Sequence, residues 1–78
     1  GAIMRTLDTI AREIMQDWRK PYFGAVPYLQ AMSTLTDINQ PYGYDSGESI
    51  VRYFLCNAST WRGDTARRVK AELKGMLK

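Results

Sequence analysis

The sequence predicts an all-α fold, a compact four-helix bundle with helices at about 6–19, 27–38, 46–61 and 65–77. Each of these segments places apolar residues three and four positions apart, which is the spacing of one helix face. Proline and glycine residues interrupt the pattern between the segments. With 78 residues, the chain has room for one hydrophobic core. Residues 1–3, before Met4, look like the remnant of a tag, so we expect a single helical domain over 4–78.

The first helix is expected from Thr6, a candidate N-cap, to Arg19. Pro21 ends it, because the residue before a proline is steered away from helical geometry. Its apolar face consists of Leu7, Ile10, Ala11, Ile14 and Trp18.

The second helix is expected to start near Pro27, since proline is well accommodated at the first helical position. Its apolar face comprises Tyr28, Leu29, Met32, Leu35 and Ile38. The helix should give way to a long loop over 39–44, where Pro41 and Gly43 break the pattern.

The third helix is expected to be central and buried. Between Ile50 and Ala58 only Arg52 and Asn57 carry an obvious polar group, so this helix would be apolar around most of its circumference. Asp45 and Glu48 have the spacing of a capping box at its start. The lone cysteine, Cys56, is expected to be a buried thiol that behaves as a small apolar group.

The third helix is expected to end at Gly63. The fourth helix is expected to begin after Asp64, which would be its N-cap. Its apolar face consists of Ala66, Val69, Leu73, Met76 and Leu77. The short junction at Gly63 allows either a tight hairpin or a crossing near a right angle.

Positive charge is concentrated at the end of the chain. The net charge is +3, and residues 61–78 hold six cations and two anions. A helix, a short turn and a basic helix form the outline of a helix-turn-helix, whose second helix enters the DNA major groove. Many helical hairpins share this outline, and lysines on a surface helix usually form a solvated face that keeps a protein soluble. The nucleic-acid-binding candidates are Arg62, Arg67, Arg68, Lys70, Lys74 and Lys78.

Four aromatic residues fall outside the predicted helices, and they are Tyr22, Phe23, Tyr42 and Tyr44. They either fold over the ends of the bundle and close its core or remain exposed as anchors for a protein partner. If both loops lie at one end of the bundle, the four residues would form a single patch.

Catalytic and metal-binding patterns are missing from the sequence. The chain has no histidine, which is the commonest general base and metal ligand. We find no glycine-rich phosphate loop and no calcium-loop spacing. The sequence therefore predicts a protein that is not an enzyme and has no cofactor or metal. No apolar run approaches the roughly 20 residues that span a bilayer, so we expect no membrane association and a cytoplasmic location.

Several stretches of the chain resemble a family of small uncharacterised all-helical proteins encoded by phages of mycobacteria and related actinobacteria. They are YFGAVPYL at 22–29, YGYD at 42–45, YFL at 53–55 and TWRGDTARRVKAELK at 60–74. The resemblance implies a protein made in the host cytoplasm, and it carries no established activity to any residue. It favours a protein of the host cell as the partner.

We therefore expect a protein-interaction module that acts on a host protein. The alternative is a DNA-binding protein that uses the basic last helix. A third possibility is self-assembly, in which an apolar face left over from a thin core makes a homo-oligomer.

Overall fold

The computed structural model describes residues 5–77, so the predictions for residues 1–3 and for Lys78 lie outside the described residues. Within that range the chain is mostly helical. The elements are α1 (Leu7–Asp17), the short 3-10 helix η1 (Phe23–Ala25), α2 (Val26–Met32), β1 (Pro41–Tyr42), β2 (Asp45–Ser46), α3 (Gly47–Cys56) and α4 (Asp64–Met76). The prediction of an all-α fold is thus correct for the helices and misses a small two-stranded sheet.

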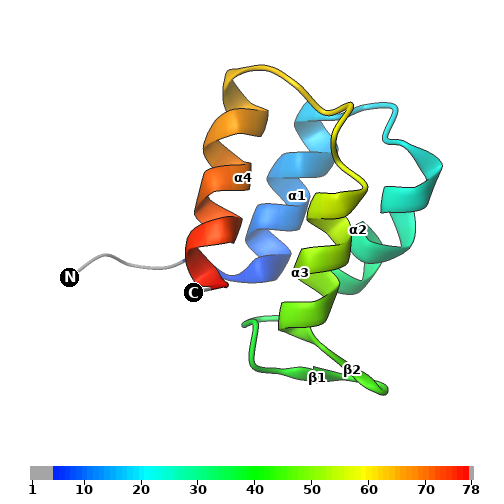
Figure 1. The fold of residues 1–78 in the computed structure, drawn as a ribbon, viewed down its shortest axis with the longest axis vertical. Coiled ribbons are helices and arrows are strands. Elements are labelled where there is room, and N and C mark those ends of the chain that lie inside the picture. The colour runs from blue at the N-terminus through cyan, green and yellow to red at the C-terminus, as the bar shows by residue number, and fades with distance from the viewer. Residues whose placement is uncertain (1–4, 78) are drawn as a thin grey trace.

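Figure 1 shows how the helices are arranged. α1 packs against both α2 and α4, and α2 packs against α3. α3 and α4 run in opposite directions, and residues 57–63 connect them across one end of the molecule. Neither a tight hairpin nor a right-angled crossing at Gly63 is therefore present.

Three aromatic residues occupy the middle of the core. The rings of Trp18 and Trp61 are stacked, with centroids 5.8 Å apart, and Phe54 meets both rings edge-on. Trp61 lies in the 57–63 connection, yet it is only 2% exposed, and its Nε1 donates a hydrogen bond to Asp17 Oδ2 at 2.8 Å. This contact ties the connection to the end of α1. The other fully buried large side chains are Leu7, Ile10, Ile14, Met32, Leu73, Val51 and Val69.

α1 is close to its predicted length. Thr6 precedes it as predicted, but the Thr6 hydroxyl contacts the Thr9 hydroxyl instead of capping a backbone N–H. The first free N–H groups of the helix, at Leu7 and Asp8, donate to backbone carbonyls of residues 36 and 35. The turn after α2 therefore satisfies the donors that a side-chain cap would otherwise satisfy.

α2 ends at Met32, well before the predicted end at residue 38. The hydroxyls of Ser33 and Thr34 donate to the carbonyls of Gln30 and Ala31, at 2.6 and 2.8 Å. Such local bonds compete with continuation of the helix. Leu35 is nevertheless buried, so the apolar spacing located a core residue that is not helical.

The loop predicted over 39–44 contains part of a β-hairpin. Pro41 pairs with Ser46, and Tyr42 pairs with Asp45. The turn includes Gly43, whose φ of 60° is a left-handed conformation suited to glycine. The capping box predicted for Asp45 and Glu48 is wrong: the cap of α3 is Ser46, whose Oγ accepts from the N–H of Ser49 at 3.2 Å.

α3 is shorter and more exposed than predicted, and it is not the central helix: α1 packs on both α2 and α4, whereas the main helix partner of α3 is α2. It ends at Cys56, where the prediction continued to residue 61. Arg52, Tyr53 and Cys56 are exposed, so α3 is not buried on all sides and the Cys56 thiol is not a core group. Gly63, with a φ of 114°, immediately precedes α4 and does not end α3. Asp64 is accordingly the first residue of α4 instead of its cap.

Ion pairs join α1 to α4. Arg5 Nη1 lies 2.7 Å from Glu13 Oε1, and Arg5 Nη2 lies 2.6 Å from Glu72 Oε1. Arg68 pairs with the second oxygen of Glu13. Hydrogen bonds from Arg68 and then from Arg5 lower the pKa of Glu13 below its usual range. The folded state therefore favours the ionised form of this carboxylate.

Replacing Glu13 by glutamine is expected to lower the free energy of unfolding at pH 7 by about 1 kcal/mol or less, since pairs at this exposure are partly screened by water. Because folding lowers the pKa of Glu13, its contribution is present above the unfolded value of 4.5 and is lost as pH falls through the folded value. Urea unfolding at pH 7 and pH 3 measures this. The difference between the wild type and Glu13→Gln should shrink at pH 3, and a constant difference would contradict the assignment.

Candidate functional site

The structure leaves all four predicted interaction residues at the surface. Phe23 is 79% exposed, Tyr44 is fully exposed, and Tyr22 and Tyr42 are also exposed. They therefore do not close the core. In Figure 1, residues 20–25 lie toward the end of the molecule where α3 finishes, and the hairpin lies at the opposite end. The two pairs consequently do not form a single patch.

Tyr22 and Phe23 form one aromatic pair, and two tyrosines from α2 and α3 form a second. The rings of Tyr22 and Phe23 lie 4.7 Å apart, and those of Tyr28 and Tyr53 lie 5.5 Å apart. We call the surface formed by Tyr22, Phe23, Tyr28 and Tyr53 the aromatic ridge. Tyr22 and Tyr53 are about half exposed. Tyr28 is partly buried, because it also packs against the hydrophobic core.

Asn57 links the two halves of the aromatic ridge. Its Nδ2 donates to the carbonyl of Tyr53 at 2.9 Å. A Cβ placed on Gly24 would lie 2.6 Å from Tyr22 Cε2 and 2.8 Å from Asn57 Oδ1. Tyr22 and Asn57 thus both approach the backbone at Gly24, and the absence of a side chain there lets them lie close together.

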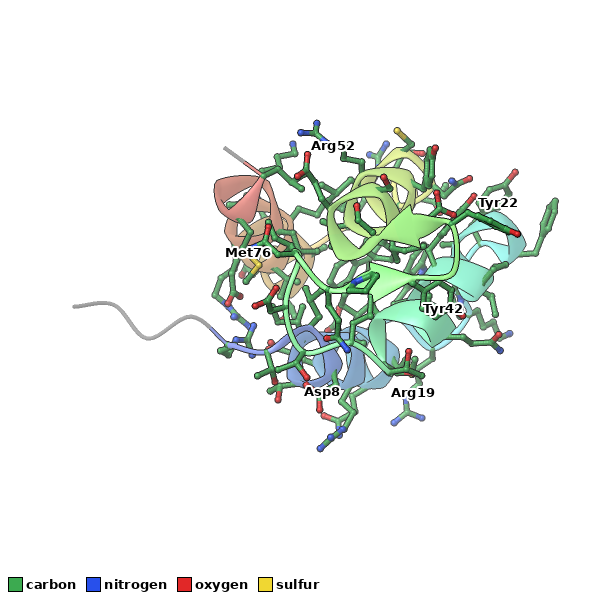
Figure 2. The ribbon with its side chains drawn as sticks, turned by 90° about the horizontal axis from the view of Figure 1, so that it is seen from below. Asp8, Arg19, Tyr22, Tyr42, Arg52 and Met76 are labelled. Carbon is green, nitrogen blue, oxygen red and sulfur yellow. The ribbon has the colours of Figure 1, made fainter. Side chains whose placement is uncertain are left out.

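Local structure explains why Phe23 points outward. In η1 the N–H of Ala25 donates to the carbonyl of Tyr22 at 2.8 Å, and Ala25 itself is completely buried. The tight turn anchors the chain through a small residue and leaves the large ring of Phe23 in solvent. Figure 2 labels the neighbouring Tyr22 at one side of the molecule, beside the cyan helical ribbon.

Two exposed cations come shortly before the aromatic ridge in the sequence. Arg19 and Lys20 are exposed and directly precede Pro21 and Tyr22. From Trp18 to Thr36 the sequence contains no acidic residue. A surface that combines apolar rings with nearby cations is complementary to an apolar patch bordered by carboxylates.

Some of the cations predicted to bind nucleic acid instead make contacts within the protein. Arg68 pairs with Glu13, and Lys70 Nζ donates to the carbonyl of Trp61 at 2.6 Å while lying 5.9 Å from the centre of its ring. Partial burial, followed by the charges of Lys74 and Arg62, lowers the pKa of Lys70. Exposed cations remain at Arg62, Arg67 and Lys74.

The connection to α4 differs from that of a helix-turn-helix. Such a motif joins its two helices by a turn of about three to four residues and crosses them at a wide angle. Here residues 57–63 make the connection, and the two helices run antiparallel.

A cavity of about 400 Å³ opens beside the start of α4. Its lining includes Ser59, Trp61, Arg62, Arg67 and Lys70. This cavity was not predicted, because Ser59 and Trp61 were assigned to a continuous helix. Three of the six nucleic-acid-binding candidates therefore converge on one concave surface.

The described residues contain no group of three or more His, Cys, Asp or Glu side chains arranged to hold a metal ion. In the same part of the chain, no helix has the length and apolar character required to cross a bilayer.

Comparison with known proteins found no matching protein-family model, no matching curated protein and no matching solved structure. The resemblance to small phage-encoded proteins thus stays a prediction from the sequence.

Proposed function

We propose that this protein is an interaction module that binds another protein through the aromatic ridge. The observation that carries the proposal is the cluster of aromatic rings at the surface, in which Phe23 is 79% exposed. Aromatic side chains bury large areas on binding and are frequent hot spots of protein interfaces. In this proposal the helices form a compact bundle that holds the aromatic ridge in place.

The partner we propose has an apolar patch with acidic residues along one edge. Phe23, Tyr22 and Tyr53 would enter the apolar part, and Arg19 and Lys20 would face the carboxylates. The resemblance to phage-encoded proteins favours a protein of the bacterial host, and it places the encounter in the host cytoplasm. The exposed cations would speed association more than they strengthen binding.

A double variant tests this assignment. Phe23→Ser with Tyr53→Ser should weaken the affinity for the partner by about 100-fold or more, since hot-spot truncations each cost at least about 2 kcal/mol. The matched control is Tyr42→Ser with Tyr44→Ser, which removes two exposed aromatic rings at the far end of the molecule. The partner is first captured from host lysate and identified, and the dissociation constant is then measured with the purified partner.

Three results would contradict the proposal. Equal losses in the two double variants would show that the aromatic ridge has no special role. Loss in the hairpin variant alone would move the interface to Tyr42 and Tyr44. Light scattering that shows an oligomer, which the Phe23 and Tyr53 variant dissociates, would make a second copy of the chain the partner.

A second candidate function is binding to DNA. The observation that favours it is the convergence of Arg62, Arg67 and Lys70 on one cavity. In this alternative α4 contacts backbone phosphates, which supply affinity without reading the sequence. Titration of a labelled DNA duplex with the protein tests this alternative, and the same titration is used in the next subsection to test ligand binding in the cavity.

A further inference from the structure

The cavity beside α4 combines positive charge with concave shape. Arg62, Arg67 and Lys70 line it together with the hydroxyl-bearing Ser59 and the buried ring of Trp61. It is separate from the aromatic ridge, which is built on η1, α2 and α3. None of the four residues of the aromatic ridge lines the cavity, so substitutions can test the two surfaces separately.

The positive charges that line the cavity are only weakly neutralised by nearby carboxylates. Among the described residues, the carboxylate paired with a lining cation is that of Asp64, whose Oδ1 lies 3.5 Å from Arg67 Nη2. Both side chains of this pair are largely in water, where such a contact is weak. Partial burial is the main cause of the lowered pKa of Lys70, and repulsion from Lys74 and then from Arg62 adds to it. An anion in the cavity would relieve this repulsion.

The lining groups also retain free hydrogen-bond donors. The ammonium of Lys70 has three donors, and its bond to the Trp61 carbonyl uses one of them. Each guanidinium offers a planar set of N–H groups that matches two oxygens of a phosphoryl group or carboxylate. Ser59 adds a hydroxyl on the same surface.

We propose that this cavity binds a phosphoryl group, with Arg62, Arg67 and Lys70 as its three cationic partners. A phosphomonoester carries about −1.5 to −2 charges and three acceptor oxygens, whereas a carboxylate carries one charge and two oxygens. The larger charge and the additional oxygen suit three converging cations better. A small phosphorylated molecule supplies this charge on one group, whereas the backbone of a nucleic acid supplies it through neighbouring phosphates that carry one charge each.

Titrations with three probes distinguish these sources: sodium phosphate, adenosine monophosphate and a labelled DNA duplex. Tryptophan emission reports the first two, because Lys70 lies over the ring of Trp61 and an anion at its ammonium changes the field at the indole. Ionic strength is kept low and constant with sodium chloride for phosphate and the mononucleotide, and the duplex titration is repeated at increasing sodium chloride concentrations. Saturable binding is expected for at least one probe.

The test variant is Arg62→Gln with Arg67→Gln, which should weaken that binding by about tenfold or more through loss of charge-assisted hydrogen bonds. The matched control is Arg12→Gln with Arg52→Gln. It removes the same charge from two exposed side chains that do not line the cavity. The control should weaken binding clearly less than the test variant, because it changes the net charge equally but removes no group that lines the cavity.

If phosphate or the mononucleotide binds as tightly as the duplex, the ligand of the cavity is a small phosphorylated molecule. Duplex binding at least about tenfold tighter, with a salt slope that the test variant reduces by about two, assigns backbone phosphates. Absence of saturable binding by every probe at low salt would overturn the proposal. Equal weakening in the test and control variants would overturn it as well.

Discussion

Trp61→Ala is expected to lower the free energy of unfolding by about 3–5 kcal/mol, the usual cost of deleting a fully buried aromatic side chain. The ring is 2% exposed, it stacks on Trp18, and its N–H bonds to Asp17. A domain of this size rarely has more than about 3–5 kcal/mol of stability from its core. The variant should therefore be largely unfolded at 25 °C in far-UV circular dichroism and urea titration.

Trp61→Phe separates the two contributions of this residue. It keeps an aromatic ring in the core and removes the hydrogen bond to Asp17, so we expect a loss well below that of the alanine variant. If Trp61→Ala instead costs less than about 1.5 kcal/mol, the 57–63 connection is not part of the core in solution.

Gly47→Ala is expected to destabilise the protein by about 1–3 kcal/mol, which is typical of overpacking. Gly47 is buried at the start of α3, and an added Cβ would lie 2.7 Å from the carbonyl oxygen of Asp37 and 2.8 Å from Cα of Ile38. Both are backbone atoms. The turn that contains them is also held by bonds from the N–H groups of Gly47 and Glu48 to the carbonyls of Gln40 and Ile38.

Gly75→Ala is the matched control, because Gly75 also lies in a helix but has open space where its Cβ would be. Alanine should stabilise the protein there by about 0.5–1 kcal/mol, as its helix propensity exceeds that of glycine. Chemical denaturation of both variants measures the two changes. A stabilising Gly47→Ala would contradict the close packing of α3 on the turn after α2.

Apolar spacing predicted α1 and α4 to within about two residues at each end, because each buries a single stripe on its neighbours. It failed where a buried residue is not helical. Leu35 and Trp61 continue the helical spacing of α2 and α3, but both lie in connecting segments that fold back onto the core. Periodicity records which residues are buried and does not distinguish a helix from a turn that buries the same residue.

The hairpin was missed because its strands are two residues long, too short for an alternating pattern to be visible. Half of the aromatic ridge was predicted, since Tyr22 and Phe23 lie outside the helices that the sequence predicts. Tyr53 was hidden by the expectation that α3 is buried all round. Its position off the face of Ile50, Val51 and Phe54 was the available signal, but its pairing with Tyr28 depends on the packing of α2 on α3.

The ion pairs between α1 and α4 also constrain the order of folding during synthesis. Arg5 and Glu72 are separated by 67 residues in the sequence, so their contact closes a loop that includes most of the domain. Closing such a loop costs more chain entropy than forming a local turn. The side of α1 that packs on α4 stays in solvent until residues 64–76 have left the ribosome. Folding of this domain should therefore follow its translation instead of accompanying it.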